Sequence, residues 1–191
     1  MEPTTESVRT IGRTVSMDRD IQLIKSNIRE VPDFPKKGIL FYDITPVLGQ
    51  SELFQKTVDI FAHHYLNQQI DMVVAIESRG FIFGSPLAYK LKTGYTVVRK
   101  VGKLPYKTIR KSYELEYGTD HLEMHEDAIK PGMKVLIVDD LLATGGTALA
   151  TSNLVEELGG EVVSIAFLVE LTALKGREKL GDRELLTLIK Y

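Results

Sequence analysis

The stretch VLIVDDLLATGGT, residues 135–147, decides the fold and the site that we expect for this chain. Its first four residues are apolar and three of them are β-branched, which is typical of a parallel strand covered on both faces. Asp139 and Asp140 follow directly, and a turn of small residues then leads into a helical pattern. Ligands of parallel α/β sheets bind at the carboxyl ends of strands, so we expect a ligand site beside these two acids.

The turn after the acids, Ala143–Thr147, has the composition of a phosphate-binding loop. Gly145 and Gly146 adopt backbone angles that other residues resist, and they let a ligand approach the main chain. Thr144 and Thr147 add hydroxyl donors, and the amides at the N-terminus of the helix that follows bind phosphate well. A phosphate cradle next to two carboxylate acceptors for hydroxyl groups suits a sugar phosphate.

Other interpretations of this stretch fit its residues less well. A P-loop requires a lysine after its last glycine, and none follows Gly146. The Gly-x-Gly-x-x-Gly fingerprint of dinucleotide-binding proteins does not occur here. A receiver domain also carries a pair of acids, but near the N-terminus and with a third acid after a later strand. In an ordinary strand–turn–helix unit, paired acids beside two glycines would have no packing use.

Length and composition indicate one globular domain. The chain has 191 residues, enough for a full hydrophobic core, and its net charge of −2 excludes the basic footprint of a nucleic-acid-binding protein. It contains no cysteine, which excludes disulfides and thiol chemistry, and no apolar run long enough to span a membrane. Residues 1–17 lack the apolar core of a signal peptide, so we expect a disordered N-terminal tail, with Met17 as an alternative start, before a single domain over 18–191. We therefore expect a cytoplasmic protein that binds small molecules, with no nucleic acid and no membrane as partners.

Hydrophobic periodicity predicts alternating strands and helices. Helical patterns cover 18–30, 51–67, 80–91 and a segment that begins near Ala148 and ends at Gly159–Gly160; strands are predicted at 72–76, 95–99, 135–138, 162–169 and 185–189. Residues 38–46 form an extended segment or a loop. This alternation predicts an α/β fold with a central, mostly parallel sheet that is flanked by helices.

A second chemical segment, Glu77–Phe81, also ends a buried strand and opens a helix. Arg79 at such a strand end can bind phosphate or pyrophosphate oxygens through two parallel hydrogen bonds. By itself the segment is equally consistent with a surface arginine before a helix. Because it accompanies the acids and glycines of residues 135–147, we interpret it as part of the same site.

Residues 103–128 are polar and include Tyr106, Tyr113 and Tyr117. A polar stretch of this length inside a compact domain is typical of a lid or a binding loop. A plain surface hairpin is the alternative. We expect a mobile lid, because a ligand site is predicted nearby and apolar residues at regular spacing are few.

Several of these segments resemble one protein family. The stretch 135–147 resembles the phosphoribosyl-pyrophosphate-binding motif of type I phosphoribosyltransferases. Adenine phosphoribosyltransferases show similar Lys-Leu-Pro and Leu-Glu-Tyr-Gly segments, which stand here at 103–105 and 115–118, and similar PDFP and GILFYDITP segments, at 32–35 and 38–46. The resemblance runs from about Asn27 to Lys179. It implies the type I phosphoribosyltransferase fold, with a small N-terminal hood that binds the base and a flexible catalytic loop.

The resemblance also implies a reaction, in which the 5-phosphoribosyl group of 5-phosphoribosyl 1-pyrophosphate is transferred to adenine to give AMP and pyrophosphate. It implies Mg²⁺ as cofactor, held mainly by the substrate and by water without a direct protein ligand, and a homodimer. It further implies a cis peptide bond between Glu77 and Ser78. The segment Leu171–Leu180 matches the family as well, and we interpret it as structural.

The resemblance implies four catalytic residues, which are Glu116, Asp139, Asp140 and Arg79. It also implies four sets of contacts with the substrates. The expected contacts are Asp139 and Asp140 for the ribose hydroxyls; Ala143, Thr144, Gly145, Gly146 and Thr147 for the 5-phosphate; Ser78, Arg79 and Lys103 for pyrophosphate; and Ile39, Leu40, Phe41 and Tyr42 for adenine. Glu116 is expected to act as an acid or a base at the purine.

Two alternatives stay open from the sequence. The first is a phosphoribosyltransferase of the same fold that uses another base, such as xanthine; residues 32–46 argue against it. The second is a non-catalytic regulator that binds phosphoribosyl pyrophosphate. Such a regulator should lack the glutamate of the loop or carry a DNA-binding segment, whereas Glu116 is present and residues 1–30 hold only one predicted helix.

Overall fold

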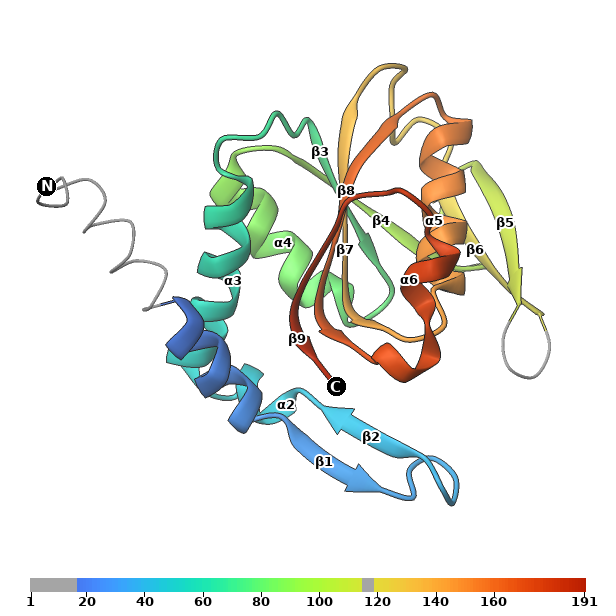
Figure 1. Cartoon of the computed structure of the whole chain (residues 1–191). Coiled ribbons are helices and arrows are strands. Elements are labelled where there is room, and N and C mark those ends of the chain that lie inside the picture. The colour runs from blue at the N-terminus through green and yellow to red at the C-terminus, as the bar shows by residue number, and fades with distance from the viewer. Residues whose placement is uncertain (1–16, 115–118) are drawn as a thin grey trace, which may run out of the picture. The chain divides into compact units, whose positions relative to one another are not determined.

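A computed structural model describes residues 17–114 and 119–191 (Figure 1). The chain divides into two compact units, one up to Ile60 and the other from Phe61 to Tyr191. None of the helices in the described ranges is long and apolar enough to cross a membrane.

The first unit contains a helix over residues 17–26 and a two-stranded hairpin. Strands β1 (Arg29–Pro32) and β2 (Leu40–Asp43) pair antiparallel. The short helix α2 (Thr45–Leu48) follows, and α3 (Ser51–Tyr65) runs across the boundary between the units. The predicted helix over 18–30 is wrong at its end, because residues 29 and 30 belong to β1. Pairing with β2 outweighs the local helical pattern there, and the proline at position 32 disfavours a helical residue before it.

The second unit is built on a seven-stranded sheet in the order β5-β6-β4-β3-β7-β8-β9. Its parallel part comprises β4 (Gly94–Lys100), β3 (Met72–Ile76), β7 (Lys134–Leu142), β8 (Glu161–Glu170) and β9 (Leu185–Lys190). This confirms the predicted α/β fold with a mostly parallel sheet. The predicted strand at 72–76 and the predicted helix at 80–91 have the bounds that the structure gives them.

Two helices cover opposite faces of this sheet (Figure 1). Helix α4 (Gly80–Leu91) lies on the face that carries Ala75, because a Cβ atom on Gly84 would stand 2.7 Å from the Ala75 Cβ. Helix α5 (Gly146–Glu157) shares its core with Val74 and Ile76, the neighbours of Ala75 in β3. Successive residues of a strand point to opposite faces, so both faces are buried and the strands are apolar throughout.

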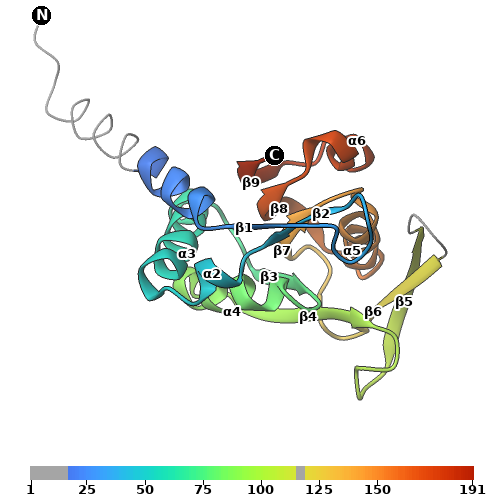
Figure 2. The same cartoon turned by 90° about the horizontal axis from the view of Figure 1, so that it is seen from below.

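An antiparallel hairpin extends the sheet beyond β4 (Figure 2). Strands β5 (Thr108–Glu114) and β6 (Thr119–His125) pair with each other along seven positions. The segment 103–128, which we expect to form a mobile lid, thus contains two paired strands in its described part. Leu122 and Met124 alternate along β6 and reach the core, where pairing and burial order the strand.

Candidate active site

The two acids lie inside β7, which is longer than the predicted 135–138. Pairing with β3 ends at Val138, whereas pairing with β8 continues from Asp139 to Leu142. The acids therefore stand beyond the end of one neighbouring strand and alongside the other. Asp140 is buried, with 3 % of its surface exposed, and Asp139 is half-buried.

Arg79 compensates the buried charge of this pair. Its Nε lies 2.9 Å from Asp140 Oδ2, an oxygen that has no hydrogen-bond partner among the described residues. The main-chain amide of Asp140 donates to Asp139 Oδ1 over 2.9 Å. Burial raises the pKa of Asp139, and the negative charge of Asp140 raises this pKa further. Burial also raises the pKa of Asp140, and the positive charge of Arg79 opposes that shift.

The segment Glu77–Gly80 approaches the acids directly. The peptide bond between Glu77 and Ser78 is cis, as the resemblance predicts. Gly80 begins α4, and a Cβ atom there would stand 2.6 Å from the carbonyl oxygen of Val138 and 3.1 Å from Asp139 Oδ1. Only a glycine permits this approach, so α4 begins against the strand that carries the acids. Ser78 is exposed at the surface of the same turn.

Glu77 joins this segment to the end of β4, which sequence reasoning missed. Its carboxylate accepts from Arg99 Nε at 3.2 Å and from the Lys100 amide at 3.0 Å, and Lys103 Nζ bonds the other oxygen. Although burial alone would raise it, these hydrogen bonds hold the pKa of Glu77 below its usual range. The signal in the sequence is a carboxylate at the end of one parallel strand and three cations at the end of the next one along the chain.

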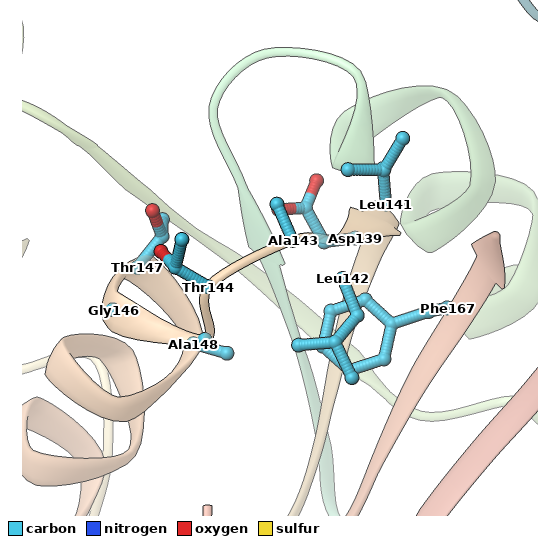
Figure 3. A pocket seen from close by; sticks show the side chains of 10 residues that line it. Asp139, Leu141, Leu142, Ala143, Thr144, Gly146, Thr147, Ala148 and Phe167 are labelled. Carbon is cyan, nitrogen blue, oxygen red and sulfur yellow. The ribbon is translucent and has the colours of Figure 1, made fainter. Parts of the chain in front are cut away.

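The turn after the acids encloses a pocket of ≈ 70 Å³ (Figure 3). Asp139 lies at one end of the turn, and Thr144 and Thr147 lie at the other, by the first turn of α5. Gly145 precedes the helix with a φ of 78°, and no side chain caps the helix N-terminus. The first amides of a helix have no partner within it, so they can bind an anion. The lining residues are Asp139, Leu141, Leu142, Ala143, Thr144, Gly145, Gly146, Thr147, Ala148 and Phe167.

Comparison with known proteins agrees with this geometry. The model of the phosphoribosyl transferase domain matches residues 49–190. The adenine phosphoribosyltransferase of Syntrophotalea carbinolica is 57 % identical over 168 residues, which are 88 % of this chain and 98 % of that protein. The chain belongs to the adenine phosphoribosyltransferase family.

Solved structures of the family have the same fold. The adenine phosphoribosyltransferase of Thermoanaerobacter pseudethanolicus superposes with a TM-score of 0.87 at 54 % identity, over 90 % of this chain and 99 % of that one. The enzyme of Saccharomyces cerevisiae, crystallised with an imino-altritol bisphosphate and adenine, gives a TM-score of 0.86 at 43 % identity, over 89 % of this chain and 98 % of that one. The fold expected from the resemblance is thereby confirmed as that of adenine phosphoribosyltransferases.

The four residues expected to bind adenine lie together in the first unit of this family member. Leu40, Phe41 and Tyr42 are part of β2, and Ile39 precedes it. Phe41 packs edge-on against Phe34 with ring centroids 5.1 Å apart, while Ile39 and Leu40 are exposed apolar side chains. The segment thus offers an aromatic ring and aliphatic surface, which suit a planar base.

A second buried carboxylate, Glu123 on β6, also escaped sequence reasoning. It accepts the amides of Gly102, Lys103 and Leu104 over 3.0, 3.2 and 3.2 Å, and the Thr108 hydroxyl over 3.2 Å. Burial alone would raise the pKa of Glu123, but these donors hold it below its usual range. Glu123 therefore fixes the backbone at Lys103, the expected pyrophosphate contact. Glu116 lies outside the described residues.

Proposed function

We propose that this chain transfers the 5-phosphoribosyl group from 5-phosphoribosyl 1-pyrophosphate to adenine N9, which forms AMP and releases pyrophosphate. The observation that carries the proposal is the pocket at the N-terminus of α5, which Asp139 lines beside the ion pair of Asp140 and Arg79. This arrangement combines an anion site with carboxylates for hydroxyl groups. Adenine in the crystals of the yeast relative supports the choice of base.

In this proposal the amides and hydroxyls of Ala143–Thr147 bind the 5-phosphate, and Asp139 and Asp140 accept hydrogen bonds from the ribose hydroxyls. The bond between C1 and the pyrophosphate oxygen breaks while the bond to adenine N9 forms, so positive charge develops on the ribose. Carboxylates held beside the sugar favour that charge. Ser78, Arg79 and Lys103 bind the pyrophosphate that leaves with the electron pair of the broken bond.

The base would bind along Ile39–Tyr42, where a main-chain carbonyl at Leu40 and an amide at Tyr42 would read the amino group and N1 of adenine. Glu116 would take the proton that N9 loses or donate a proton to N7. We also propose a homodimer, as the resemblance implies, and a location in the cytoplasm.

Mg²⁺ is part of the proposal. Within the described part of the chain, no three His, Cys, Asp or Glu side chains group as a metal site. The residues fit an ion held mainly by substrate and water, because Asp139 presents to the pocket a carboxylate that can accept a hydrogen bond from a water of such an ion. When bound, the ion would neutralise pyrophosphate charge.

Pyrophosphate release with adenine, hypoxanthine, guanine and xanthine in parallel tests the function. We expect adenine to be used at least about a hundredfold better than hypoxanthine, because a 6-oxo group would leave a buried polar group unpaired. Equal use of adenine and hypoxanthine would contradict the base assignment, and no release with any base would support the regulator.

A further inference from the structure

The phosphate loop Ala143–Thr147 rests on another backbone segment, at the start of α6 (Gly176–Lys179). A Cβ atom on Gly145 would stand 2.5 Å from the carbonyl oxygen of Gly176. A Cβ atom on Gly176 would collide with the carbonyl oxygen of Ala143 and stand 2.9 Å from the Gly145 nitrogen. The two glycines therefore let the two main chains touch, and no side chain fits between them.

An ion pair with a buried carboxylate holds the second segment in place. Arg177, the residue after Gly176, donates from Nε and Nη2 to the two oxygens of Glu170, over 3.0 and 2.8 Å. The Thr187 hydroxyl of β9 donates to Glu170 as well, over 2.9 Å. The Glu170 side chain is only 6 % exposed, whereas that of Arg177 is 41 % exposed, so the carboxylate end of this fork is shielded from water. The hydrogen bonds from Arg177, above all, hold the pKa of Glu170 below its usual range.

Glu170 in turn lies next to the beginning of the phosphate loop. It ends β8, where it pairs with Leu142, the residue before Ala143. The next amide, that of Leu171, donates to the Leu142 carbonyl over 2.9 Å. The contacts thus close a ring that runs from Leu142 through the loop to Gly176 and back through Glu170.

We propose that Glu170, Gly176 and Arg177 are positioning residues that set the shape of the phosphate loop, and hence the affinity of this site for the 5-phosphate of its ligand. The inference rests on the proposed function, in which this loop binds that phosphate. From the sequence, we interpret the segment 171–180 as structural. The inference adds a part in substrate binding to that role. The residues touch the loop and not the ligand, so they act through the amides of Ala143–Thr147.

Gly176→Ala tests the contact between the two main chains. We expect the dissociation constant of ribose 5-phosphate, measured by calorimetry, and the KM of phosphoribosyl pyrophosphate both to rise about ten- to hundredfold, because small displacements of a binding group cost that much. The KM of adenine should stay unchanged. Glu178→Ala is the matched control, since its side chain is exposed on the same short helix, and it should behave as the wild type.

Arg177→Met tests the ion pair, and Arg177→Lys should restore part of the affinity because it keeps the charge but not the two-pronged geometry. Arg183→Met is the control for a lost ion pair of similar length, since Arg183 binds Glu156 over 2.9 Å and the Leu180 carbonyl. If Arg177→Met and Arg183→Met lower the melting temperature alike but only the former weakens ribose 5-phosphate, the proposal holds.

The two proposals fail in different ways. If the wild type does not bind ribose 5-phosphate, the phosphate site itself is wrong. If the wild type binds it and the folded Gly176→Ala and Arg177→Met variants bind it equally well, the positioning role is wrong while the site stands. If Gly176→Ala does not fold, the variants Arg177→Met and Arg177→Lys take its place in this comparison. Wild-type affinity for ribose 5-phosphate in both of these variants would overturn the proposal.

Discussion

The negative charge of Asp139 lowers the stability of the folded chain, whereas the proposed binding of ribose uses this charge. Since its pKa is raised in the folded protein, the folded state keeps its proton to higher pH than the unfolded chain. Stability is therefore lost as pH rises from the ordinary aspartate value of 3.8 to the raised value, and the loss is complete above it. Asp139→Asn keeps the shape and the acceptor for the Asp140 amide but removes this charge.

We expect Asp139→Asn to unfold at a higher temperature than the wild type at neutral pH and to lose turnover. The gain in stability should vanish below pH 3.8, where the wild-type residue is protonated in both states. Thermal unfolding between acidic and neutral pH measures this, with the exposed Asp127→Asn as control. A variant that is less stable than the wild type at neutral pH, with normal turnover, would make Asp139 structural.

The proposed role of Glu116 is tested by its own substitution. Glu116→Gln should reduce the single-turnover rate much more than the affinity for adenine, because the amide cannot exchange a proton with the purine. Glu114→Gln is the matched control, since it has the same chemistry two positions earlier, and should be nearly silent. A silent Glu116→Gln beside a crippled Glu114→Gln would show that the family's motif is misaligned on this chain.

At the scale of elements, the hairpin of β5 and β6 depends on Glu123. Glu123→Gln places an amide donor among groups that all donate, so we expect about 1–3 kcal/mol lower free energy of unfolding at neutral pH. Because the pKa of Glu123 is lowered in the folded state, the difference should shrink as pH falls below the ordinary glutamate value of 4.5. Denaturant unfolding measures it, with the exposed Glu126→Gln as control; equal effects of both changes would refute the role.

The elements also show which parts of the fold a sequence can predict. The strand at 72–76 was predictable because a continuous apolar run bounded by polar residues marks a buried strand without reference to its partners. The strand at 29–32 was not predictable in this way, because it forms by pairing with β2, whose residues lie farther along the chain. The hairpin was only one of two alternatives, because its few apolar residues, such as Ile109, Leu122 and Met124, stand in a mostly polar stretch.

The residues of the candidate site also differ in how far the sequence predicts them. Residues that we propose to bind through a local motif, such as the phosphate loop and Arg79, are adjacent in sequence to the strand that presents them. Glu77 and Glu123 act on partners some twenty residues away, between 15 and 26 positions along the chain. No local pattern marks such a carboxylate, because its hydrogen-bond donors come close to it only when the chain folds.

For the whole molecule, the proposed site predicts that AMP stabilises the folded chain. A free concentration about 100 times the dissociation constant adds about 2.7 kcal/mol, which raises the melting temperature by roughly 5–10 °C for a chain of this size. Adenosine, which lacks the 5-phosphate, should give a much smaller shift at the same concentration. Equal shifts with AMP and adenosine, measured by calorimetry, would show that the phosphate loop adds nothing to binding.

The contact between Glu77 and Lys103 has a consequence for how the proposed pyrophosphate site responds to salt. The lysine already has a counter-ion, so an incoming anion exchanges one ion pair for another instead of creating a new one. Ionic strength screens the pair that is lost as well as the pair that is gained, and the two effects largely cancel. A site that keeps an internal competitor in this way should bind its anion less tightly than its positive charges alone suggest, and release it at a rate that changes little with ionic strength.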